Sequence, residues 1–177
     1  MASRDDEIGG KDRRIKIRPF GISDLSAVME IEKKAFQDAW DESWFIFFFQ
    51  SNPSGFMVAV DEKDRVVGYA IVGLETEEED AWLYAEKSGA PPESGHLLNI
   101  AVDEKWRRKK IGTMLLDEAC RYVLSHGADE LLLEVRTDNR GARKFYVLKD
   151  FKDTGRRLKN YYPDGGDAIV MRKKLAG

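Results

Sequence analysis

Apolar and polar residues follow two spacings along this chain, one typical of strands and the other of helices. Residues 15–18 alternate apolar and polar side chains, which predicts a half-buried strand closed by Pro19. The apolar residues of 25–35 recur at helical spacing, and Ser23 or Asp24 can cap the helix that this spacing predicts. The sequence therefore predicts a strand and then a helix at the start of the folded region.

An aromatic run at 44–49 marks a second, shorter helix, which begins at Asp41 or Ser43 and ends by residues 52–55. A run of this kind is more often part of a core than a platform for a ligand. The remaining pattern predicts strands at 56–60, 65–74, 96–102, 131–136, 151–158 and 168–172, and helices at 111–127 and 139–148.

This order of elements combines hairpins, which pair antiparallel, with strand–helix–strand crossovers, which pair parallel. We therefore predict an α/β (α+β) fold with a mixed, mostly antiparallel central sheet and helices on both faces. Residues 1–14 are polar and aperiodic and are expected to form a flexible tail, which leaves 15–177 as a single domain. The acidic segment 75–94 is expected to be a surface insertion.

Composition narrows the class of protein. The chain has 177 residues, of which 42% are hydrophobic, but no stretch approaches the roughly 18 apolar residues that cross a bilayer. A lone cysteine, Cys120, and two histidines make an internal disulfide or a zinc site implausible, so we expect no metal and a cytoplasmic setting. A net charge of −3 disfavours broad nucleic-acid binding as the main task.

One segment, residues 99–113, has the features of an anion site. A predicted strand enters a loop with five basic side chains among the six residues 105–110, and a helix begins at Ile111. The first N–H groups of a helix have no partner inside it, and the helix dipole adds partial positive charge. Gly112 permits close backbone approach and Thr113 adds a hydroxyl, so a pyrophosphate would fit. The alternative is a basic turn that only makes the helix start soluble.

A second segment places the acidic Glu134 in an otherwise apolar strand. Because burying a bare carboxylate is costly, Glu134 either pairs with Arg136 or His96 or faces a wet cleft. In a cleft it could act as a general base, whereas the alternative is a structural ion pair. Tyr146 follows on an amphipathic helix, where a tyrosine is more often core than catalytic.

Taken together, these segments resemble the Gcn5-related N-acetyltransferase (GNAT) family over roughly residues 15–174, and within it the RimI-type and archaeal N-terminal acetyltransferases. The resemblance is carried by Gly95-His96-x-x-Asn99-Ile100-Ala101-Val102, Arg107-Arg108-Lys109-Lys110-Ile111-Gly112, Leu133-Glu134-Val135-Arg136 with Asn139, Ala142-x-x-Phe145-Tyr146, and Tyr161-Tyr162-Pro163-Asp164-Gly165-Gly166-Asp167-Ala168.

The resemblance implies an enzyme that uses acetyl-CoA, bound in a splay between the strand that ends at Val102 and the strand at 131–136. It implies Glu134 as general base, Tyr146 as general acid and His96 as an assisting residue. It implies that the cofactor is bound by Ile100, Ala101, Val102, Arg107, Arg108, Lys109, Lys110, Ile111, Gly112, Thr113, Asn139 and Tyr146. It places Phe36, Tyr161 and Tyr162 in the groove for the acceptor.

The phosphate loop departs from the family pattern, because Lys110 stands where the first glycine of the pattern would be. A lysine there costs on the order of 1 kcal/mol if its φ is positive, and its ammonium could compensate by contacting a phosphate. Gly166 likewise replaces an acidic residue near the end of the chain.

The resemblance favours a protein N-terminus as the acceptor, with possible proximity to the ribosome and a monomer or weak homodimer. The alternatives are a GNAT enzyme that acts on a lysine or a small amine, and an inactive module that only binds CoA.

Overall fold

The computed structural model describes residues 14–75 and 93–176. Most of the expected tail, and most of the expected acidic insertion at 75–94, therefore lie outside the described residues.

The described chain contains seven strands and four helices, which follow the predicted order. The strands are β1 (Lys16–Pro19), β2 (Phe56–Val60), β3 (Val66–Glu75), β4 (Ser94–Val102), β5 (Glu130–Arg136), β6 (Lys152–Leu158) and β7 (Ala168–Lys174). The helices are α1 (Leu25–Ala35), α2 (Glu42–Ser51), α4 (Ile111–Ser125) and α5 (Arg140–Val147), with single 3-10 turns at Ile22–Asp24, Pro53–Gly55 and Glu104–Trp106.

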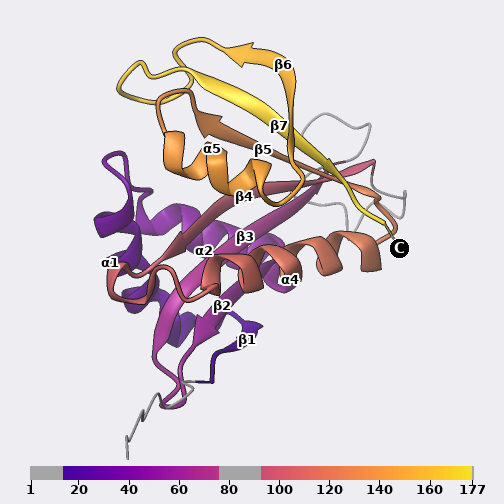
Figure 1. Ribbon diagram of the computed structural model, residues 1–177. Coiled ribbons are helices and arrows are strands. Elements are labelled where there is room, and N and C mark those ends of the chain that lie inside the picture. Colours follow the sequence, from indigo (N-terminus) through magenta and orange to yellow (C-terminus); the bar gives the residue numbers. More distant parts are fainter. Residues whose placement is uncertain (1–13, 76–92, 177) are drawn as a thin grey trace, which may run out of the picture.

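All strands join one sheet in the order β1-β2-β3-β4-β5-β7-β6, and every neighbouring pair is antiparallel except β4 and β5. Helices α1 and α2 pack on one face, and α4 and α5 pack on the other (Figure 1). The predicted mixed sheet with helices on both faces is therefore confirmed.

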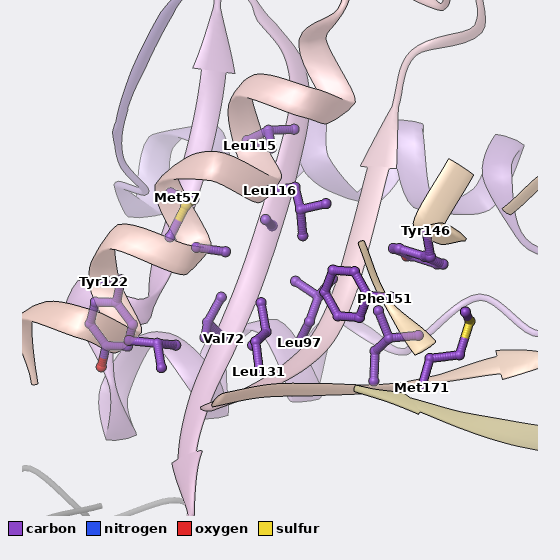
Figure 2. Packing of buried hydrophobic residues seen from close by; sticks show 14 of the residues in the cluster. Met57, Val72, Leu97, Leu115, Leu116, Tyr122, Leu131, Tyr146, Phe151 and Met171 are labelled. Atoms are coloured by element: carbon purple, nitrogen blue, oxygen red, sulfur yellow. The ribbon is translucent and has the colours of Figure 1, made fainter. Parts of the chain in front are cut away.

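The larger core lies between the sheet and helices α4 and α5 (Figure 2). Helix α4 buries one stripe of side chains, made of Ile111, Leu115, Leu116, Ala119, Tyr122 and Val123. Their spacing of three and four residues places them on one side of the helix. Full burial of each large aliphatic side chain contributes about 1.5–3 kcal/mol, so this stripe holds α4 across the sheet.

The aromatic run contributes to the core on the opposite face. Phe45 and Phe48 are buried, and the Phe45 ring packs edge-on against Tyr69 with ring centroids 5.8 Å apart. Trp44, in contrast, is 50% exposed. The run is thus core on the side of α2 that faces the sheet, as the sequence predicts, and surface on the other.

Strands β4 and β5 are held together over a very short distance. Their parallel register consists of Gly95 opposite Leu131 and His96 opposite Leu132. Beyond these pairs the two strands diverge, and β5, β6 and β7 form a unit that leans away from β1–β4 (Figure 1).

A β-bulge lies in β4 just past the last paired residue. In the pairing with β3, Val72 is opposite Leu97 and Ile71 is opposite Asn99, so Leu98 is the extra residue. A bulge bends its strand and increases the local twist, which here coincides with the separation from β5.

Gly95 is required where β4 passes under α4. A Cβ atom added at Gly95 would lie 2.2 Å from Cγ2 of Val123. We predict that Gly95→Ala destabilises the protein by about 1–3 kcal/mol, because the helix and strand must separate. The melting temperature should fall by roughly 3–10 °C, measured by differential scanning calorimetry. Gly141→Ala is the control, since its added Cβ would lie 3.8 Å from the nearest neighbouring atom. Equal melting temperatures for the two variants would contradict this packing.

Candidate functional site

The divergence of β4 from β5 leaves a cavity of about 600 Å³. Its walls come from β4 and β5, the loop after α1, the first turns of α5 and the loop between β6 and β7. Ten residues that the sequence analysis assigned to the site line it together: Phe36, Ile100, Ala101, Val102, Arg107, Glu134, Asn139, Tyr146, Tyr161 and Tyr162. The predicted splay is therefore present, and residues up to 126 positions apart meet there.

Glu134 is paired, and its partner is one of the two that the sequence left open. Nε2 of His96 lies 2.6 Å from Oε2 of Glu134, and Nδ1 of the same ring lies 3.0 Å from Oε1 of Glu75. Burial alone would lower the pKa of His96, but the two carboxylates outweigh burial and raise it to about 9. His96 is therefore an imidazolium at neutral pH, clamped between two acidic side chains.

Arg136 does not pair with Glu134 but lines the cavity and pairs with two aspartates. Its Nη2 lies 2.9 Å from Oδ2 of Asp38, its Nη1 lies 3.0 Å from Oδ2 of Asp164, and its guanidinium carbon lies 4.0 Å from the centre of the Tyr162 ring. The guanidinium thus connects the loop after α1 to the loop between β6 and β7.

Two tyrosines at the cavity lie in very different surroundings. Tyr146 is buried and packs edge-on against Phe151 (Figure 2) and against Phe145. Burial raises the pKa of its hydroxyl. Tyr161 is 48% exposed; burial of its hydroxyl, together with the charge of Glu134 and a hydrogen bond to it, raises its pKa to about 12. Both tyrosines therefore hold their protons throughout the physiological pH range.

The basic loop leads into α4 with a left-handed backbone at two places. Lys110 has a φ of 62° and Arg108 a φ of 61°. The sequence left open whether the backbone at Lys110, where the family pattern has a glycine, has a positive φ, and it gave no indication of one at Arg108. Lys110 is also the residue that precedes the first turn of α4.

Two predicted cofactor residues have structural tasks for their side chains. Ile111 is fully buried in the core, and Asn139 caps α5 by accepting the Ala142 N–H at 3.0 Å. The side chain of Ile111 is therefore part of the core rather than of the ligand site.

The structure adds residues to which the sequence gave no role. Glu32, Asp38 and Trp40 line the cavity, and Glu75 pairs with His96. Asn99 and Arg136, which the sequence showed only as parts of the motifs, line it as well. Glu32 carried a detectable signal, because it lies four residues after Val28 on the apolar face of the predicted helix.

Comparison with known proteins identifies this architecture. The family model described as the acetyltransferase (GNAT) family matches residues 25–151. The chain is a GNAT acetyltransferase. It is 35% identical over 159 residues to an N-acetyltransferase of Methanocaldococcus jannaschii, covering 89% of this chain and 90% of that protein. It is also 30% identical over 168 residues to an N-alpha-acetyltransferase of Sulfurisphaera tokodaii, covering 93% and 96% of the two chains.

Solved structures agree. The crystal structure of Ard1 from Thermoplasma volcanium superimposes with a TM-score of 0.79 at 26% identity, covering 92% of this chain and 99% of that one. The ribosomal-protein-S18-alanine N-acetyltransferase of Escherichia coli superimposes with a TM-score of 0.72 at 25% identity, covering 93% and 96%.

This acetyltransferase uses acetyl-CoA, and its residues fit that cofactor. The cavity runs between strands whose facing backbone edges are unpaired beyond His96, and it reaches Arg107 in the basic loop. A long, partly peptide-like arm ending in phosphates matches a backbone edge followed by positive charge.

Among residues 14–75 and 93–176, no three acidic, histidine or cysteine side chains are grouped to hold a metal ion. No helix of the described chain is long and apolar enough to span a membrane. Burial raises the pKa of the Cys120 thiol, which suits a filler rather than a nucleophile.

We predict that the imidazole of His96 titrates near pH 9, measured by NMR on protein labelled in its two histidines. His96→Gln assigns the resonance by removing it. Titration of His96 near pH 6.5 would contradict its pairing with two carboxylates.

The same pKa predicts how stability depends on pH. Because the folded pKa of about 9 exceeds the unfolded value of 6.5, the contribution of His96 is complete below pH 6.5 and disappears as pH rises through 9. Urea unfolding of His96→Gln should therefore show a deficit of up to about 3 kcal/mol at pH 6 and little deficit above pH 10. A deficit that does not change with pH would contradict this interpretation.

Variants of Lys110 test whether its ammonium group contributes to CoA binding or whether its side chain obstructs the phosphate. If its ammonium contacts a phosphate, Lys110→Gly and Lys110→Asn should both weaken CoA binding about two- to fivefold in calorimetric titrations. Both replacements tolerate the left-handed backbone, so they remove the charge alone. Tighter CoA binding by the glycine variant would show instead that the lysine side chain only obstructs the phosphate.

Proposed function

We propose that this enzyme transfers an acetyl group to the α-amine of a protein N-terminus by direct attack. The observation that carries the proposal is the set of groups at the cavity: a paired carboxylate, Glu134, beside a groove built from Phe36, Tyr161 and Tyr162. Relatives named N-alpha-acetyltransferases align with this chain over nearly its whole length, which supports the same acceptor.

Glu134 is the proposed general base. An α-amine has a reference pKa of about 7.7–8.0, so a sizeable fraction is neutral at pH 7 and the base removes only the last proton. Glu134 receives that proton on its carboxylate, directly or through a water. The imidazolium of His96 orients the carboxylate and, being charged already, does not accept the proton itself.

Tyr146 is the proposed proton donor to the leaving sulfur. Bound acetyl-CoA supplies an activated thioester, whose sulfur resembles a cysteine thiol with a pKa of about 8.5. Proton transfer from an ordinary tyrosine would be uphill by about 2 kcal/mol, and burial makes it more so for Tyr146. Tyr146 therefore hydrogen-bonds the sulfur and donates its proton late.

Positioning is expected to supply most of the rate enhancement. The backbone of Ile100, Ala101 and Val102 holds the pantetheine arm, and a nearby backbone N–H polarises the thioester carbonyl. Arg107, Arg108, Lys109, Lys110, Gly112 and Thr113, together with the backbone of Ile111, are proposed to bind the pyrophosphate, and Asn139 to contact the pantetheine region. The chain's task is thus to hold amine and thioester in one orientation.

At neutral pH an α-amine is a better acceptor than a lysine amine. A lysine amine, with a reference pKa of about 10.4, is almost entirely charged at neutral pH, so far fewer molecules are ready to attack. Asp38 and Arg136 pair in the wall of the cavity, next to the groove proposed for the peptide end.

We predict that Glu134→Gln lowers kcat about 10²- to 10⁴-fold. Combined with Tyr146→Phe, it should abolish acetyl transfer while the Kd for acetyl-CoA stays within a fewfold of the parent value. The assay uses acetyl-CoA with peptides that differ in their first two residues, and mass spectrometry locates the acetyl group.

The location of the acetyl group decides between acceptors. An acetyl group on the α-amine supports the proposal, and one found only on lysine or on small amines contradicts it. CoA binding without transfer to any amine would make the chain a binding module.

A further inference from the structure

A buried carboxylate that takes no part in the proposed proton transfers lies in the wall of the cavity. Glu32, in the last turn of α1, is 1% exposed. Its burial raises the pKa of the carboxyl, against the hydrogen bonds that it accepts. Such a group is costly to keep in a core, so its contacts are expected to matter.

Three segments that are distant in sequence donate hydrogen bonds to this one carboxylate. The backbone N–H of Trp40 donates to Oε1 at 2.8 Å, and the hydroxyl of Tyr69 donates to Oε2. Nδ2 of Asn99 lies 3.4 Å from both oxygens. All three of these hydrogen-bond partners are donors, which is the set that an ionised carboxylate requires, while the charge of Asp38 adds to burial in raising the pKa of Glu32.

The donors belong to the two sides of the proposed reaction. Trp40 lies in the loop that also places Phe36 and Asp38 on the acceptor side of the cavity. Asn99 follows the bulged Leu98 of β4, at the start of the backbone edge proposed to hold the cofactor. Glu32 therefore connects the acceptor-side loop to the cofactor-side strand.

We propose that Glu32 is a positioning residue that sets the distance between the acceptor loop and the β4 bulge. This inference rests on the proposed function for the identity of the acceptor, but not for the contacts themselves. Glu32 lines the cavity but is only 1% exposed, and both of its carboxylate oxygens already accept hydrogen bonds, so it acts through Trp40 and Asn99 rather than by touching the peptide.

A variant of Tyr69 can distinguish a positioning role of Glu32 from the loss of a direct contact with the substrate. It is 0% exposed and is not among the residues that line the cavity, so its hydroxyl can affect the acceptor only through Glu32. Tyr69→Phe keeps the ring that packs against Phe45 and Phe56 and removes a single donor from Glu32.

The test compares Glu32→Gln, Tyr69→Phe and the double variant with Glu30→Gln, an exposed position on the same helix that pairs with Lys34. We expect Glu32→Gln to raise the KM for the acceptor about tenfold and Tyr69→Phe to raise it less. The Kd for CoA should stay within twofold for both, and the double variant should be no worse than Glu32→Gln alone. Glu30→Gln should change nothing.

A merely structural role gives a different pattern. Lower melting temperatures with an unchanged acceptor KM in both Glu32→Gln and Tyr69→Phe would overturn the inference, and so would an increase seen equally in Glu30→Gln. If Glu32→Gln does not fold, the conservative Tyr69→Phe decides alone.

Amide hydrogen exchange at Trp40 tests the same contact without any acceptor. Exchange at least tenfold faster in both variants supports the inference, and an unchanged rate overturns it. If the parent enzyme acetylates no peptide, the proposed function fails, and this exchange rate alone decides the role of Glu32.

Discussion

Two residue pairs, Gly95 with Leu131 and His96 with Leu132, hold the halves of the sheet together on the parallel side. They are effective because α4 packs across the junction, with Val123 against the bare backbone of Gly95. Just beyond them the bulge at Leu98 turns β4 away, and the strands open into the cavity. The site therefore depends on a short paired segment of β4 and β5 that lies directly beside their separation. This arrangement leaves backbone N–H and C=O groups of both strands unpaired at the cavity while α4 still holds the two strands together.

Three charged side chains around the gap each interact with two or more partners from different segments of the chain. His96 lies between Glu75 and Glu134, Arg136 lies between Asp38 and Asp164, and Glu32 gathers three donors. A buried charge that lacks its partners is expensive, so each set of partners resists displacement of the loop or strand to which its members belong. Ion pairs and hydrogen bonds, as well as packing, therefore fix the loop after α1, the loop between β6 and β7 and the diverging strands β4 and β5 relative to one another.

Much of this could be predicted from the sequence, because the relevant signals are local. Period-two and helical spacings gave the order of strands and helices, and an acid within the apolar strand β5 pointed to Glu134. The lysine at a glycine position of the family pattern raised the question of a positive φ at Lys110, and the structure has one there.

What the sequence could not predict depends on contacts between distant segments. It left open whether His96 or Arg136 pairs with Glu134, since only the register of β4 and β5 decides this. The bulge at Leu98 could not be predicted, because it is defined by the pairing of β4 with β3 and leaves no mark in the order of apolar residues of β4 alone. Glu32 was overlooked because its donors are 8, 37 and 67 residues away.

The central claim is that the gap between β4 and β5 is where the cofactor binds. A crystal structure of the complex with CoA tests it most directly. The account predicts the pantetheine arm beside the backbone of residues 98–102, opposite residues 133–136, with the pyrophosphate at the amides of 108–113. Density for CoA at another place, with no density between β4 and β5 and no phosphate at the left-handed turn of Lys110, would contradict this binding site.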